Sequence, residues 1–220
     1  MNGKAKDDAR GMGKHRIEAL ADGIFAVAMT LLVLDIKSPE NLWFDTDHAL
    51  AVHLAGFEHS FVMYAISFVV LGIFLFCHHV QLHFVHRVDR RLLWTNLLFL
   101  LFVVLIPFST DLLGDHGHLQ LPVVIYAVNL LLLVLLLYLH LRYLVANPRL
   151  AVPELTPEAV TLINRQLLLL GLVPACSIAV SFHSPRLGMY LYTLLVVPVF
   201  LSGRIDQLTR GATEDDDPAR

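Results

Sequence analysis

Long apolar runs follow one another along this chain, separated by short polar connections. A helix needs roughly 20 such residues to cross the hydrocarbon core of a bilayer, and the runs are of that length. They show no alternation of apolar and polar residues with period two, which favours helices over a β-barrel. The pattern predicts an all-α membrane domain with six transmembrane helices, at residues 17–36, 57–82, 92–113, 121–145, 160–182 and 186–205.

The connections between these runs are short, so no separate soluble domain is expected between them. The stretch 37–56 carries several acidic residues and is expected to form a short extracytoplasmic loop or an interfacial segment. The predicted organisation is a cytoplasmic N-terminal tail at 1–13, a six-helix channel domain at 14–207 and an acidic, disordered C-terminal tail at 208–220.

Composition agrees with the membrane assignment. Hydrophobic residues make up 56% of the chain and charged residues only 16%, against about 25% in an ordinary soluble domain. The net charge of −3 is too small to indicate a nucleic-acid partner. Cys77 and Cys176 both fall inside apolar runs, which excludes a secreted disulfide scaffold.

The distribution of positive charge predicts the orientation. Cytoplasmic connections of membrane proteins carry an excess of Lys and Arg. With both termini in the cytoplasm, all but two of the 16 Lys and Arg residues fall on the cytoplasmic side, the exceptions being Lys37 and Arg186. An odd number of spans would spoil this sorting, so the charges support six spans and two cytoplasmic termini.

The first span contains an ionisable residue, Asp22. A charge at that depth is costly and indicates a functional site or a structural network. On an ideal helix Val27, Thr30, Leu31 and Leu34 lie within about 100° of one another, and Asp22 lies about 140° from Val27. These four residues therefore form one stripe along the helix, which suits a pore lining if several copies of the chain meet on one axis. Asp22, on nearly the opposite side, would point into the helix bundle. Packing against neighbouring helices also produces such stripes.

The motif Arg16-x-x-x-Leu20-Ala21-Asp22, followed by Thr30-Leu31-Leu32, resembles the first-helix signature of the transmembrane protein 175 family of endolysosomal and bacterial potassium channels. Leu20 and Ala21 stand where the family motif has Phe and Ser, and Ala21 lacks the hydroxyl. The similarity extends over roughly 14–113, through Tyr64-x-x-Ser67-Phe68, His78-His79, Asn96-Leu97-Leu98-Phe99-Leu100 and Leu105-Ile106-Pro107-Phe108-Ser109-Thr110.

This resemblance implies a pore lined by the first helices of a homotetramer and narrowed by apolar side chains. The chain has no Thr-Val-Gly-Tyr-Gly filter segment, which fits that expectation. By position, the constriction would consist of Val27, Thr30, Leu31 and Leu34, with Asp35 at the outer mouth. The polar network holding the first helix would consist of Arg16, Asp22 and His78.

The function implied is passive conduction of potassium across a bacterial plasma membrane, with proton permeation as a further possibility. The partners implied are the lipid bilayer and three further copies of the chain, and no cofactor beyond the permeant potassium ion is expected. The main alternative is a six-span, proton-coupled metal or cation transporter. Such transporters usually carry paired acidic or histidine sites in the second and fifth spans, and the fifth span here has neither Asp nor Glu.

The histidines near the end of the second span suggest other chemistry. His79, His83 and His86 fall on one face of a helix at a spacing that suits zinc, and histidines also sense pH near neutrality. An interfacial or network role explains them as well, together with His78, and no metal site is predicted. Motifs of metalloproteases, serine hydrolases and phosphate-binding loops are absent from the sequence, so no enzyme activity is expected.

Overall fold

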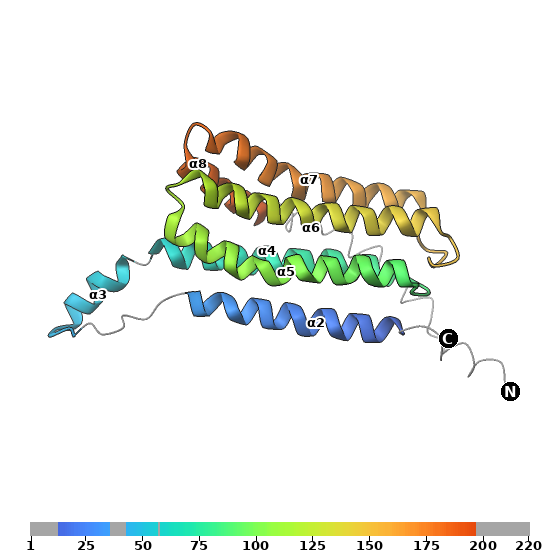
Figure 1. Ribbon diagram of the computed structural model, residues 1–220, viewed down its shortest axis with the longest axis horizontal. Coiled ribbons are helices and arrows are strands. Elements are labelled where there is room, and N and C mark those ends of the chain that lie inside the picture. The colour runs from blue at the N-terminus through green and yellow to red at the C-terminus, as the bar shows by residue number, and fades with distance from the viewer. Residues whose placement is uncertain (1–12, 36–42, 57, 197–220) are drawn as a thin grey trace, which may run out of the picture.

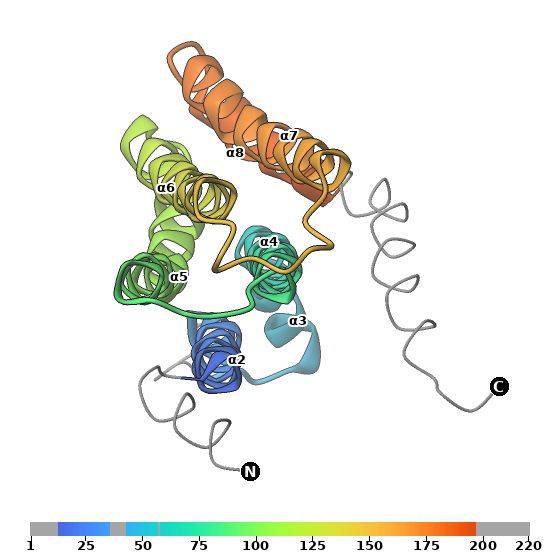
Figure 2. The same cartoon turned by 90° about the vertical axis from the view of Figure 1, so that its right-hand side faces the viewer.

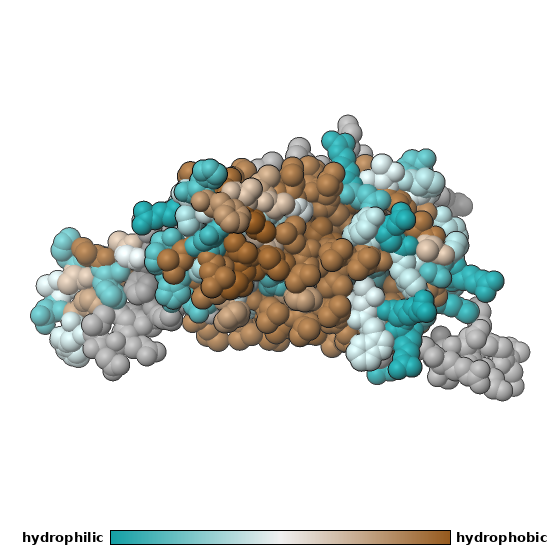
Figure 3. All heavy atoms as spheres, turned by 45° about the horizontal axis from the view of Figure 1, so that its top comes forward, coloured by the Kyte–Doolittle hydropathy of each residue, from teal (hydrophilic) through white to brown (hydrophobic). Residues whose placement is uncertain are grey.

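The computed structural model describes residues 13–35, 43–56 and 58–196, and within these ranges the chain is almost entirely helical. Five helices there are long and apolar enough to cross a membrane. Figure 1 shows them running side by side, and Figure 3 shows an apolar band between two polar ends. They are α2 (Lys14–Leu31), α4 (Glu58–His83), α5 (Arg90–His116), α6 (Gln120–Ala146) and α7 (Pro157–Ser181).

The predicted sixth span lies only partly within the described residues. After α7 the chain turns back through α8 (Pro185–Tyr190) and a 3-10 helix, η2 (Leu191–Val196). A Cβ at Gly188 would lie 2.9 Å from the carbonyl oxygen of Ser177, so this close return requires glycine. The rest of that span and the predicted tails, apart from Gly13, lie outside the described residues.

Polar caps explain where two of the long helices begin. The Asp89 carboxylate accepts a hydrogen bond from the backbone N–H of Leu92 at 2.8 Å and starts α5. The Thr156 hydroxyl accepts one from the N–H of Ala159 at 3.3 Å, and Pro157 follows as the first residue of α7. Each cap stands three residues before the apolar part of its helix, which begins at Leu92 in α5 and at Ala159 in α7.

The acidic stretch after the first span contains a short helix, α3 (Asp47–Ala55), capped by Thr46. It has no buried residue and stands apart from the bundle (Figure 1). Trp43, just before it, is almost fully exposed. The stretch predicted as a loop or interfacial segment thus contains a short helix in its second part. Residues 36–42 of this region lie outside the described residues.

The α4–α5 and α6–α7 connections are joined by backbone hydrogen bonds at one end of the bundle. The N–H of His86 donates to the carbonyl of Leu150 at 2.7 Å, and that of Val152 donates to the carbonyl of Phe84 at 3.0 Å. The N-terminal end of α2 lies at the same end, where Lys14 Nζ donates to the carbonyl of His83. We call this the basic end and the opposite one the α3 end.

The helices form layers around a central pair. Figure 2, viewed from the basic end, shows α4 and α5 in the middle, α2 below them and α6 and α7 above. Buried hydroxyls join three of these helices toward the α3 end, because Thr110 of α5 donates to Ser67 of α4 at 2.8 Å and Ser67 lies 3.1 Å from the Tyr126 hydroxyl of α6. In this arrangement the described residues of the other helices cover α2 on one side.

Candidate functional site

Helix α2 has one fully buried face, which packs against α4 and α5. Its aromatic centre is Phe25, whose ring centroid lies 6.1 Å from that of Phe99 and 6.4 Å from that of His78. Small residues on the same face let the helices approach closely, as is usual between membrane helices. The buried residues of this face are Ile17, Ala21, Phe25, Ala28 and Leu32.

The four residues predicted to form the constriction lie on the opposite face, three on α2 and Leu34 on the short 3-10 helix that continues it. Val27 is 57% exposed, Leu31 38% and Leu34 71%, and Thr30 is exposed as well. The helix changes to a 3-10 helix at Leu32 (η1, Leu32–Asp35), in which residues three apart nearly eclipse one another. This change brings Leu34 closer to the line of Leu31 than a continuous α-helix would.

Thr30 contributes the polar group of this face. Its hydroxyl donates to the carbonyl of Val27, one turn back, at 2.8 Å. The donor is therefore satisfied within the helix, and the hydroxyl oxygen keeps lone pairs that can face a cation. The face thus offers apolar bulk at three positions and an oxygen acceptor at one.

Asp22 meets α4 through a different histidine from the one predicted. Its carboxylate lies 2.9 Å from Nε2 of His79. From the sequence, the Asp22 side chain is predicted to point into the bundle. In the structure this side chain is instead about half exposed beside α4. Arg16 lies exposed near the basic end and forms no ion pair with Asp22 in the part of the chain that the structure describes.

His78, the third member of the predicted network, points inward instead. Its Nε2 lies 2.6 Å from Oδ1 of Asn96 on α5, and its ring stacks on Phe99 with centroids 5.0 Å apart and planes 4° from parallel. Adjacent residues of α4 therefore serve two contacts: His78 joins α4 to α5, and His79 joins it to α2. The structure brings Asp22 and His79 together and does not place Arg16, Asp22 and His78 in one hydrogen-bonded group.

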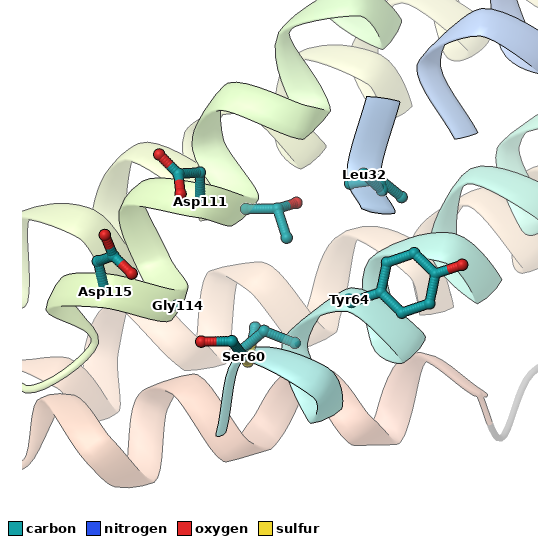
Figure 4. A pocket seen from close by; sticks show the side chains of 8 residues that line it. Leu32, Ser60, Tyr64, Asp111, Gly114 and Asp115 are labelled. Carbon is teal, nitrogen blue, oxygen red and sulfur yellow. The ribbon is translucent and has the colours of Figure 1, made fainter. Parts of the chain in front are cut away.

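At the α3 end, a small cavity of about 10 Å³ opens beside Leu32, the first residue of η1 (Figure 4). Leu32 and Tyr64 line it together with two acidic residues of α5, Asp111 and Asp115. This acidic pair was not among the predicted site residues, although its spacing of one helical turn at the end of a span was a visible signal. Asp35, predicted at the same end, closes η1, and its side chain lies outside the described part.

The histidines of α4 do not gather into a metal-ligating group in the described ranges. His79 is engaged by Asp22, and the ring of His83 lies edge-on to Phe84 at the end of the helix. No three His, Cys, Asp or Glu side chains of the described residues lie where they could share one metal ion.

Comparison with known proteins finds similarity in the first half of the chain. The family model described as endosomal/lysosomal potassium channel TMEM175 matches residues 16–107, which contain most of α2, all of α4 and most of α5. A protein of Streptomyces collinus named as a potassium channel is 42% identical over 106 residues, which are 46% of this chain and 48% of that protein. The chain thus spans about half the length of that curated relative.

A human relative carries a different name. The protein named as endosomal/lysosomal proton channel TMEM175 is 31% identical over 103 residues, which are 44% of this chain and 20% of the human protein. The family and both of these relatives are named as ion channels and not as enzymes, in agreement with the absence of enzyme motifs from the sequence.

A solved structure extends the likeness to nearly the whole fold. A channel from Chamaesiphon minutus, described as a lysosomal potassium-selective channel TMEM175 homologue, is 27% identical, with a TM-score of 0.74 over 86% of this chain and 98% of that one. The shared fold, the match to the family model over residues 16–107 and the five long apolar helices show an integral membrane protein that is similar to the TMEM175 channels.

Proposed function

We propose that the chain is a potassium-preferring cation channel, built as a homotetramer in a bacterial plasma membrane with α2 of each copy facing a central pore. The observation that carries the proposal is the uncovered apolar face of α2, with Val27 and Leu34 more than half exposed. That face belongs to the helix at the start of the segment that matches the channel family. Four copies meeting along this face would turn an exposed stripe into a pore lining.

Apolar rings would make the closed pore a dewetted barrier. A narrow ring of Val27, Leu31 or Leu34 side chains offers no oxygen to replace the water that an ion loses on entering. Conduction would then require the rings to widen until water enters. Gating in this proposal is a movement of α2 against α4 and α5, on which its other face packs.

Preference for potassium would follow from the cost of dehydration. Potassium gives up its water more easily than sodium, so a tight pore with few oxygen ligands admits it more readily. A ring of Thr30 hydroxyl oxygens, whose protons already go to Val27, would supply partial coordination at that level.

Fixed negative charge would concentrate cations at the α3 end. Asp111 and Asp115 line the cavity beside Leu32, and Asp35 ends the same segment. Acidic groups near a pore mouth raise the local cation concentration through their field. In this proposal the basic end faces the cytoplasm, together with both termini, and a sixth span completes the subunit.

Flux measurements on the purified full chain in liposomes would test the proposal. We would impose a potassium gradient and then a sodium gradient, and compare the wild type with Leu31→Ala. The matched control is Leu168→Ala on α7, a leucine that is 70% exposed far from α2. We expect potassium flux without any counter-ion, a smaller sodium flux, and a loss of this difference in Leu31→Ala alone.

Other outcomes would overturn the proposal. Flux that occurs only against an opposing proton or metal gradient would mean a coupled transporter, the alternative from another class. Equal behaviour of Leu31→Ala and Leu168→Ala would mean that the α2 stripe is ordinary packing surface. A proton gradient imposed alone would measure proton permeation, which the name of the human relative makes worth testing.

A further inference from the structure

Four buried polar side chains form two matching pairs between α4, α5 and α6. Nε2 of His78 lies 2.6 Å from Oδ1 of Asn96, and Nδ1 of His140 lies 2.8 Å from Oε1 of Gln81. All four residues are at most 4% exposed. We call these residues the His–amide cluster; none of them belongs to the exposed face of α2.

The two pairs lie next to each other. His78 and Gln81 are both on α4 and are separated by about one helical turn. His140 is near enough to His78 for the two rings to interact electrostatically. The cluster is therefore one polar site contributed by three helices, and it sits within about 9 Å of the basic end, because Asn96 and His140 are each six residues from the end of their helix there.

The two hydrogen bonds determine which donors and acceptors of the cluster are left without a partner. A carbonyl oxygen only accepts, so each imidazole nitrogen bonded to one carries the proton. In a neutral imidazole the other nitrogen is then an acceptor. That leaves two acceptors, Nδ1 of His78 and Nε2 of His140, and two amide donors, Nε2 of Gln81 and Nδ2 of Asn96. None of these four atoms has a hydrogen-bond partner among the described residues.

We infer that the His–amide cluster is a binding site for buried water. A buried polar group without a partner is costly, so four of them on two neighbouring pairs call for a ligand. The open groups are two donors and two acceptors of no net charge, which is the pattern that water matches. A water here accepts from a side-chain amide and donates to an imidazole, joining the two pairs across the three-helix junction.

The chemistry of the open atoms sets this ligand apart from an ion. An anion would find only the two amide donors, and a cation only two imidazole nitrogens. Neither ion meets a charged partner in the cluster, whose members are two imidazoles and two amides. The site is also separate from the proposed pore, so it neither needs nor supports the channel function.

Solid-state NMR on the full chain in liposomes, with 15N-labelled histidine, tests the inference, and the probe is water itself. We expect His78 to be protonated at Nε2 and His140 at Nδ1, which are opposite tautomers. Polarisation transfer from water protons should reach the open nitrogen of both rings. The buried Tyr192 hydroxyl already donates to the Val123 carbonyl at 2.7 Å, so in a tyrosine-labelled sample it should receive none.

A variant distinguishes a water that bridges the two pairs from water that merely reaches the rings. Gln81→Leu removes one amide donor and the acceptor for His140, so the His140 ring should lose its single tautomer and the water signal at His78 should fall. His116→Asn, at the far α3 end, should leave both rings unchanged. Dry rings in the wild type, or rings protonated at both nitrogens, would overturn the inference even if Gln81→Leu did not fold.

Discussion

The carboxylate of Asp22 and Nε2 of His79 lie 2.9 Å apart, and they join α2 to α4. The pair is 55% exposed on the Asp22 side and 42% on the His79 side, so it lies at the surface of the single chain. Surface pairs usually contribute little to stability. Its importance, if α2 lines a pore, is to hold that helix in one position against the bundle.

Removal of either partner should alter gating more than folding. We expect Asp22→Ala and His79→Ala each to change the open probability several-fold, and the double variant to add little, because one contact is lost in all three. Single-channel recordings in bilayers measure this, and light scattering after size exclusion reports the assembly. Glu18→Ala is the control, since Glu18 contacts only Lys14 and His15 on its own helix among the described ion pairs. Additive effects of the two substitutions would show that the pair is not coupled.

Thr30→Val should reduce the preference for potassium. The substitution keeps the shape of the side chain and deletes the oxygen, while the lost bond to Val27 is only a local one within the helix. We expect a smaller shift of reversal potential between potassium and sodium, with little change in thermal stability. Thr161→Val on α7, which loses the same kind of bond to Pro157, should leave the reversal potential unchanged. An unchanged value in Thr30→Val would remove the hydroxyl from the selectivity mechanism.

Phe25→Ala should destabilise the subunit by detaching α2. The ring is fully buried against Phe99 and His78. Truncation of a buried Phe costs about 3–5 kcal/mol in soluble proteins, and the packing part of that cost remains in lipid. A lower Tm in detergent is the expected result. Phe108→Ala, at a ring that is 62% exposed on α5, serves as the control, and similar melting of the two variants would contradict a role for Phe25 in anchoring the helix.

Substitution of Asp89 should lower thermal stability by an amount that depends on the new side chain. One carboxylate oxygen caps α5 and the other accepts from the Tyr143 hydroxyl of α6. Loss of an N-cap costs about 0.5–2 kcal/mol, so Asp89→Ala should lower Tm, and Asp89→Asn should keep most of the stability because its oxygen still caps the helix. Thermal melts of both variants and of Tyr143→Phe separate the cap from the cross-helix bond. Equal losses in Ala and Asn variants would mean that charge, not capping, matters.

The sequence was sufficient for the five spans that the described residues contain, because the signal of a span is local. The predicted second span, 57–82, differs from α4 by a residue at each end, and the caps at Asp89 and Thr156 are written in the sequence. Periodicity also placed Val27 and Leu31 on a common face, and that face is uncovered in the single chain. The role of this face as a pore lining stays a prediction.

The partners of buried polar groups were harder to predict. The resemblance suggested His78 beside Asp22, but consecutive residues on a helix point about 100° apart, and only the packing of α2 on α4 decides which one faces Asp22. The result is His79. Likewise, nothing local in the sequence joins Gln81 to His140, which are 59 residues apart and meet only in the folded bundle.

The junction between the α4–α5 and α6–α7 connections is made by main-chain atoms, through Phe84, His86, Leu150 and Val152. Most side-chain substitutions leave these backbone hydrogen bonds intact. The two connections can therefore differ in amino-acid composition between relatives and still stay in contact. Covariation between them across relatives should therefore be weak even though they touch. Proline is the exception, because at position 86, 87 or 152 it would remove a backbone N–H that donates across this junction.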